Sequence, residues 1–181
     1  MPSEKESSQA QVASGAISSP GQYPSRGYRL RDFTLKSADG TDIRLSDYRG
    51  RSNLVLVFAG SAGTAFNLLA EIGQHDSQLQ EEEAQVLAIV QDATDAVVHL
   101  ARKLALSFPL LVDEDGCVHR EFGAAHAEAT PAIYITDRYG EVFGSYPTAV
   151  SQALPTLEEI LDWLSFINSQ CPECEPPEWP L

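Results

Sequence analysis

Positive charge is scarce in this chain. Twelve Lys and Arg residues face 26 Asp and Glu residues among 181, which gives a formal net charge of −14. Nucleic acids and anionic membranes both attract basic surfaces, so this balance argues against either as a partner. The deficit is greatest at the C-terminal end, because no Lys or Arg follows Arg138. We therefore expect a strongly acidic surface there.

Long apolar runs and cysteines are also few. No run is long enough to cross a bilayer, and the first 27 residues lack the apolar core of a signal peptide, so we expect a cytoplasmic protein. The chain has three cysteines. In a reducing compartment three cysteines do not form a disulfide framework. They are expected to be reduced thiols, metal ligands or a redox pair.

The composition divides the chain into a central domain and two tails. Residues 1–26 are rich in Ser, Gln, Glu, Gly and Pro with almost no large apolar side chains, which predicts a disordered N-terminal tail. Residues 28–168 alternate strand and helix patterns and are expected to form one domain. Residues 169–181 contain four prolines, which rule out a helix, and form a Pro-rich C-terminal tail.

The apolar patterns within the domain predict a hairpin, then β-α-β-α-β-β-α. The predicted strands are Arg29–Thr34, Ile43–Leu45, Asn53–Phe58, Gln85–Val90, Phe108–Val112, Ala132–Thr136 and Val142–Tyr146. The predicted helices begin near Thr64 and Asp92 and span Leu157–Ile167, with one further helical turn at Val118–Phe122. This order indicates an α/β fold with a central mixed β-sheet flanked by helices and an N-terminal β-hairpin extension.

Three stretches carry a resemblance to a known family. They read DFTLKSADGTDIRLSDYRGRSNLVLVF, FPLLVDEDGCVHREFG and TPAIYITDRYGEV, at Asp32–Phe58, Phe108–Gly123 and Thr130–Val142. This text resembles the peroxiredoxin and alkyl hydroperoxide reductase (redoxin) branch of the thioredoxin-like superfamily, over about residues 28–168. The resemblance implies a thioredoxin-like fold, redox chemistry with a thiol protein partner, and a homodimer as a plausible assembly.

The segment that carries the family's chemistry is altered here. Peroxiredoxins place Pro-x-x-x-Thr-x-x-Cys directly after the first long strand, and the matching text is GSAGTAFN. Thr64 retains the threonine, whereas Gly60 stands at the proline position and Asn67 at the peroxidatic cysteine position. A thioredoxin-type Cys-x-x-Cys would fall on Gly63 and Phe66, so that pair is missing too. Without a thiolate nucleophile, peroxide reduction at this position is not expected.

A second family feature has also changed. Peroxiredoxins carry an Arg just before the fourth core strand to stabilise the thiolate, and this chain has Pro131 there. Thr130-Pro131 instead matches the cis-proline loop of thioredoxin-type relatives, which predicts a cis bond. We expect Thr130 and Pro131 to face Thr64 and Asn67 across a concave site. Loop N–H groups and the helix N-terminus at this site would bind a peptide or a small polar ligand.

The remaining motif is Cys171-Pro-Glu-Cys174 in the C-terminal tail. A Cys-x-x-Cys pair is either a dithiol or half of a zinc site. The acidic neighbours Glu173 and Glu175 would raise the thiol pKa values and attract a cation, but zinc needs four ligands. Other ligands would have to come from a second subunit or from Cys117, His119, His126 and His75. A third interpretation is a structural tail that packs with Trp179.

Two hypotheses follow for the function. The first is a redoxin-family oxidoreductase whose catalytic pair is Cys171 and Cys174, with the altered family site positioning a thiol protein partner. The alternative is a non-catalytic binding or structural protein on the same fold, in which the pair is structural or binds zinc. We prefer the redox interpretation, which needs neither a cofactor nor a bound metal. The sequence indicates no particular substrate or electron donor.

Overall fold

The structure is a computed structural model that describes residues 23–122, 131–147 and 153–170. Residues 171–181 of the predicted C-terminal tail and most of the predicted N-terminal tail lie outside these residues, so both boundaries stay predictions. Ordered packing begins before residue 28. The Ser145 hydroxyl donates to the Pro24 carbonyl, and the Arg26 guanidinium lies 5.0 Å from the centre of the Trp163 ring.

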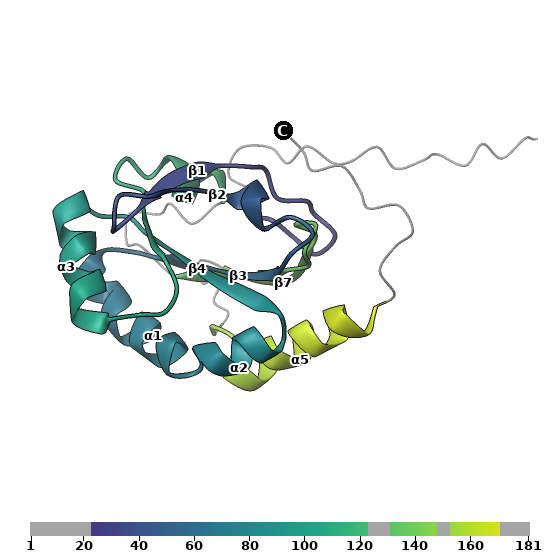
Figure 1. The fold of residues 1–181 in the computed structure, drawn as a ribbon. Coiled ribbons are helices and arrows are strands. Elements are labelled where there is room, and N and C mark those ends of the chain that lie inside the picture. Colours follow the sequence, from purple (N-terminus) through teal and green to yellow (C-terminus); the bar gives the residue numbers. More distant parts are fainter. Residues whose placement is uncertain (1–22, 123–130, 148–152, 171–181) are drawn as a thin grey trace, which may run out of the picture.

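The described elements alternate much as the apolar patterns predict (Figure 1). The strands are β1 (Thr34–Ser37), β2 (Asp42–Arg44), β3 (Asn53–Ala59), β4 (Ala84–Val90), β5 (Leu110–Val112), β6 (Ala132–Thr136) and β7 (Val142–Pro147). The helices are α1 (Ala62–Gln74), α2 (Asp76–Glu81), α3 (Thr94–Leu104), α4 (Cys117–Glu121) and α5 (Leu157–Ser169), with a 3-10 turn η1 (Leu45–Tyr48). No helix in this part of the chain is long and apolar enough to cross a membrane.

The strands form one mixed sheet in the order β2-β1-β5-β4-β3-β6-β7. β3 lies inside this sheet, paired parallel with β4 and antiparallel with β6. All seven residues of β3 are buried, which accounts for its continuous apolar sequence. The predicted mixed α/β sheet with its N-terminal hairpin, β1 and β2, is confirmed.

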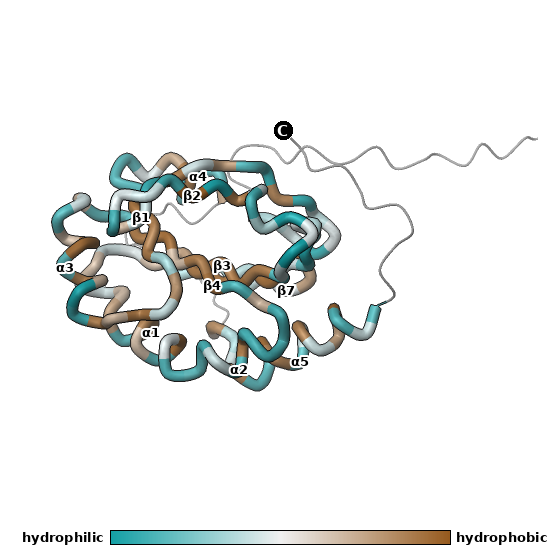
Figure 2. The backbone as a smooth tube through the Cα atoms, in the orientation of Figure 1, coloured by the Kyte–Doolittle hydropathy of each residue, from teal (hydrophilic) through white to brown (hydrophobic). Residues whose placement is uncertain are grey.

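Two apolar clusters hold layers on opposite faces of the sheet. Alternate residues of β3 supply them, because successive side chains of a strand point to opposite faces. Val55 and Val57 pack with α1, α2, α3 and α5, whereas Leu56 and Phe58 pack with the N-terminal segment and α4. In Figure 2 the hydrophobic colour is concentrated on the central strands between the two layers. Helices therefore cover both faces, as the element order predicts.

Two local predictions differ from the structure. The predicted strand Arg29–Thr34 is mostly irregular, with one bridge from Arg29 to Glu141, and regular pairing begins at Thr34. The helix predicted from Thr64 to Leu79 begins at Ala62 and divides at His75 into α1 and α2. The division coincides with Asp76, a buried carboxylate that accepts hydrogen bonds from Ser107 and Gln80. These contacts hold Asp76, the first residue of α2, in place.

A capping box begins α5. Thr156 Oγ1 accepts from the Glu159 N–H at 3.2 Å, and Glu159 Oε2 accepts from the Thr156 N–H at 2.8 Å. We expect Thr156→Ala to lower the free energy of unfolding by about 1 kcal/mol, because helix N–H groups lose their acceptor. The measurement is urea denaturation followed by circular dichroism. Thr156→Ser is the matched control, since it keeps the oxygen, and an equal loss in both variants would contradict the capping role.

Candidate functional site

The site predicted from the family motif lies at the carboxyl end of β3. This strand leads through Gly60 into α1, which carries Thr64 and Asn67. Pro131 precedes β6, whose first residue pairs with Phe58 near the end of β3. The fold therefore brings Thr64 and Pro131 to the same end of the sheet. Thr130 lies outside the described residues, so the cis bond and the role of Thr130 stay predictions.

The Thr64 side chain, at this end of the sheet, makes hydrogen bonds only with its near neighbour Ser61 among the contacts of the described residues. The Thr64 hydroxyl donates to the Ser61 carbonyl at 3.0 Å and lies 3.3 Å from the Ser61 hydroxyl. Asn67 is exposed in the second turn of α1. The helix reads AGTAFNLLAEIGQ and contains no cysteine. Hydroxyls and an amide stand where the family motif has its nucleophile, so α1 supplies no thiol for catalysis.

Asp92 occupies part of the α1 N-terminus. Its Oδ2 accepts from the Ala62 N–H at 3.0 Å, and its Oδ1 accepts from the Ala93 N–H at 2.8 Å. One carboxylate thus serves the first turn of α1 and the start of α3. Our sequence reasoning treated Asp92 only as a start signal for the second helix; its position after a buried strand was the available clue. Because Asp92 already meets an N–H group of α1, this end is less suited to an anionic ligand than predicted.

A buried pair, Asp113 and His119, lies next to the end of β3. His119 Nδ1 is 2.6 Å from Asp113 Oδ2, and the side chains are 2% and 0% exposed. His119 Nε2 is 3.2 Å from the carbonyl oxygen of Ala59, the last residue of β3. Burial raises the pKa of Asp113, but the hydrogen bonds from His119 and from the Val118 N–H outweigh it, so the net pKa is lowered.

This arrangement changes two sequence interpretations. Our sequence reasoning did not anticipate that Asp113, which follows β5, holds a buried histidine. His119 was a candidate zinc ligand, yet both of its ring nitrogens already face protein acceptors. Within the described ranges no group of three or more His, Cys, Asp or Glu residues is arranged to hold a metal ion. His126, a further candidate, lies outside those ranges.

Cys117 is an exposed free thiol at the start of α4. Arg120 Nη2 donates to its sulfur at 2.9 Å. Its pKa is raised, first by a hydrogen bond with the Asp115 side chain and further by the charge of Asp115, and Arg120 only partly opposes this. A thiol with a raised pKa is mostly protonated at neutral pH and is a weak nucleophile. Cys117 is therefore a poor candidate for a nucleophile, although it is exposed.

Cys171 and Cys174 lie outside the described residues, but the end of α5, which precedes them, is held by hydrogen bonds. Asn168 Oδ1 accepts from Asn53 Nδ2 at 2.7 Å, and Asn168 Nδ2 donates to the Glu82 carbonyl at 2.9 Å. Asn53 is the first residue of β3. The end of α5 is therefore anchored at the amino end of β3, opposite the family site.

The length of β3 separates the two candidate sites. From Asn53 to Ala59 the strand rises about 20 Å, at ~3.3 Å per residue. Cys171 is three positions beyond Asn168 in the sequence. A fully extended chain of three residues spans about 11 Å. The last described residues of α5 and the family site therefore lie at opposite ends of β3.

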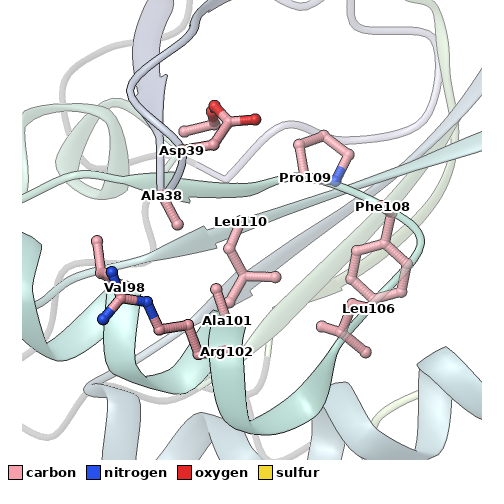
Figure 3. Close-up of a pocket in the computed structure, with 10 residues that line it drawn as sticks. Ala38, Asp39, Val98, Ala101, Arg102, Leu106, Phe108, Pro109 and Leu110 are labelled. Atoms are coloured by element: carbon pink, nitrogen blue, oxygen red, sulfur yellow. The ribbon is translucent and has the colours of Figure 1, made fainter.

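A separate groove, with a volume of about 400 Å³, lies between α3, β5 and the β1–β2 hairpin (Figure 3). Its lining is largely apolar and includes Ala101, Leu106 and Phe108, with Asp39 and Arg102 as its charged residues. Hydrogen bonds from Ser37 and Thr41 lower the pKa of Asp39, so its carboxylate stays charged. The groove contains none of the predicted site residues, and our sequence reasoning did not anticipate it, because α3, β5 and the hairpin meet only in the folded chain.

The sheet order and its two helical layers define a thioredoxin-like fold. The model of the AhpC/TSA family matches residues 27–144, and this chain belongs to that family. Peroxiredoxin Bcp of Escherichia coli K12 is 33% identical over 93 residues, which are 50% of this chain and 59% of that protein. The matched part thus spans less than two thirds of the relative's length.

Solved structures show the same fold. Peroxidoxin BcpB from Mycobacterium tuberculosis superposes with a TM-score of 0.66 at 22% identity, covering 80% of this chain and 98% of that one. A structure assigned to a thiol:disulfide interchange protein DsbE from Chlorobium tepidum gives a TM-score of 0.62 at 25% identity, covering 77% and 98%. The resemblance inferred from the sequence is therefore confirmed at the level of family and fold.

The role of Asp115 at Cys117 can be measured directly. We expect Asp115→Asn to increase the rate at which Cys117 reacts with a disulfide reagent at pH 7, because loss of the carboxylate lowers the thiol pKa. The measurement uses a Cys171→Ser/Cys174→Ser background, so that one thiol reports. Glu114→Gln is the matched control, since Glu114 bonds Thr94 instead. Equal rates in both variants would contradict the assignment.

Proposed function

We propose that this protein is a thiol–disulfide oxidoreductase of the AhpC/TSA family that uses the Cys171–Cys174 dithiol and not the family's peroxidatic position. The observation that carries the proposal is that the α1 segment, where the family motif places its thiolate, contains no cysteine. Cys117 has a raised pKa and no second thiol beside it in the described structure. Of the three cysteines in the chain, that leaves Cys171 and Cys174.

The similarities support thiol chemistry in general terms. The relatives include a peroxiredoxin and a structure assigned to a thiol:disulfide interchange protein. Because the match covers only part of the peroxiredoxin, its whole activity is not transferred to this chain. We transfer the common element, which is exchange between thiols and disulfides on a thioredoxin-like fold.

The proposed reaction is reduction of a disulfide in a partner protein. The thiolate of one cysteine attacks the partner's disulfide, forms a mixed disulfide and releases one partner thiolate. The second cysteine then attacks the mixed disulfide, closes the Cys171–Cys174 disulfide and releases the second partner thiol. Two electrons and two protons pass to the partner, and a reducing thiol protein returns the pair to the dithiol. All electrons move between sulfur atoms, so no cofactor takes part.

The anchoring of α5 supports a working site away from the family pocket. Asn168 fixes the helix end beside Asn53 and Glu82, so the dithiol starts two residues beyond Ser169 at the amino end of β3. A partner would meet the pair at this end. A homodimer is compatible with the proposal, since a second subunit could bring its own pair to the family pocket. We expect the protein to work in the cytoplasm, where thiols are kept reduced.

The redox function and the zinc alternative separate in one experiment. Full-length protein is equilibrated with a series of glutathione buffers, and the Cys171–Cys174 link is quantified by mass spectrometry. We expect a two-electron transition between roughly −200 and −270 mV, the range of cytosolic exchange proteins. Cys117→Ser is the control and should give the same potential. Purified protein is assayed for zinc in parallel, and stoichiometric zinc with a pair that resists oxidation would establish the alternative instead.

A peroxidase assay tests whether the α1 position is inactive. We expect the Cys171→Ser/Cys174→Ser variant to show no thiol-coupled turnover of hydrogen peroxide, because Asn67 offers no nucleophile. Cys117→Ser on that background is the control, and it excludes the third cysteine. Turnover that survives when all three cysteines are replaced would show that peroxide reduction does not depend on thiols in this chain.

A further inference from the structure

A second groove, with a volume of about 430 Å³, lies between the N-terminal segment, β7 and α5. Three aromatic rings and a proline line it, from Phe143, Tyr146, Trp163 and Pro147, and Arg26 is the charged residue of its lining. β7 is the last strand of the sheet order, so the groove lies at the edge of the sheet. It contains no cysteine and none of the site residues predicted from the sequence.

The aromatic rings of this groove are held by contacts with one another. Trp163 Nε1 donates to the Tyr146 hydroxyl at 2.8 Å. The Phe166 ring borders the groove, with its centre 6.1 Å from that of Trp163 and 6.2 Å from that of Phe143. Phe166 is 42% exposed, and no other large apolar side chain of the described residues is exposed to this extent. An exposed patch of rings in fixed positions is typical of a surface that binds another segment.

Arg26 adds positive charge to this aromatic surface. Its guanidinium lies 5.0 Å from the centre of the Trp163 ring and 6.0 Å from that of Phe166. Stacking on a ring leaves the N–H groups at the edge of a guanidinium open to a carboxylate. Arg26 forms no ion pair with any residue that the structure describes. The groove therefore suits a segment that combines apolar rings with negative charge.

The segment that directly follows α5 in the sequence has this chemistry. Residues 171–181 read CPECEPPEWPL, with four prolines, one tryptophan, three glutamates and no Lys or Arg. Pro-rich segments bind in aromatic-lined grooves, where their rings pack on the aromatic faces. Their backbone carbonyls make no internal hydrogen bonds in the polyproline II conformation. The Tyr146 hydroxyl, which accepts from Trp163, has its own proton to donate to such a carbonyl.

The start of this segment is close enough to the groove. α5 ends at Ser169, and Trp163 lies six residues earlier on the same helix, which corresponds to about 9 Å along its axis. Trp163, Phe166 and Ser169 are spaced three residues apart, so they share one side of the helix. From Gln170 to Pro176 an extended polyproline II chain spans about 19 Å, at ~3.1 Å per residue. The segment is therefore long enough to turn back along this side of α5.

We propose that this groove binds the chain's own Pro-rich segment, Glu175–Leu181. Pro176 and Pro177 pack on the rings of Tyr146 and Trp163, and the acidic side chains of the segment face Arg26. The Cys171–Cys174 pair is then tethered on both sides, by α5 before it and by the groove after it. The inference stands whether or not that pair is redox-active.

The first test is nuclear magnetic resonance of the full-length protein at two concentrations. We expect nuclear Overhauser contacts between the aromatic protons of Tyr146 and Trp163 and the ring protons of Pro176 and Pro177, with equal strength per molecule at both concentrations. Contacts that appear only at the higher concentration, together with a dimer in sedimentation, would assign the groove to a second copy and overturn the proposal. An absence of contacts at both concentrations would overturn it as well.

A glutamate-specific protease tests the role of the charge. The bond after Glu178 is cleaved only when the segment leaves the groove, so the cleavage rate follows the released population. We expect Arg26→Gln to raise this rate about threefold, as the loss of one exposed charge contact predicts. Arg31→Gln is the matched control, because Arg31 is also exposed but pairs with Glu121, and it should leave the rate unchanged. Equal rates in the two variants would overturn the proposal.

Discussion

The structure depends on the burial of β3 between a parallel and an antiparallel neighbour. Every residue of this strand is buried, and its alternate side chains supply both apolar clusters, so both layers of the domain are built on it. Its length also sets the distance between the two ends of the sheet. One end leads into α1 and the family site, and the other receives Asn168 at the end of α5.

The carboxyl end of β3 has the architecture of the family, and the helix that follows it, α1, contains no cysteine. The loop after β3, the start of α1 and the start of β6 are arranged as a thioredoxin-like fold requires. The polar groups here form hydrogen bonds within the protein. Asp92 accepts N–H groups from two helix starts, and Asp113 holds His119 against the Ala59 carbonyl. A site whose donors and acceptors are already paired is suited to holding a loop. Asn67 is exposed on α1, so its side chain disturbs none of these contacts.

The cysteines show how position limits chemistry. Cys117 is accessible, but Asp115 raises its pKa, so exposure alone does not make it reactive. The Cys171–Cys174 pair is adjacent in sequence, which makes a dithiol possible without help from the fold. The described chain before the pair is anchored through Asn168 at the end of β3 opposite the family site.

The sequence by itself determined the family, the mixed sheet and the loss of the thiol from α1, because these rest on local patterns and on the identity of single residues. It predicted the buried strands well, since a continuous apolar run such as NLVLVF reflects burial on both faces. It placed Thr64 and Pro131 together only through the resemblance. The contacts of Asp92, His119 and Asn168 were decided by tertiary structure alone. His119 meets Ala59 across 60 positions of sequence and Asn168 meets Asn53 across 115, and no local pattern encodes contacts between segments so far apart.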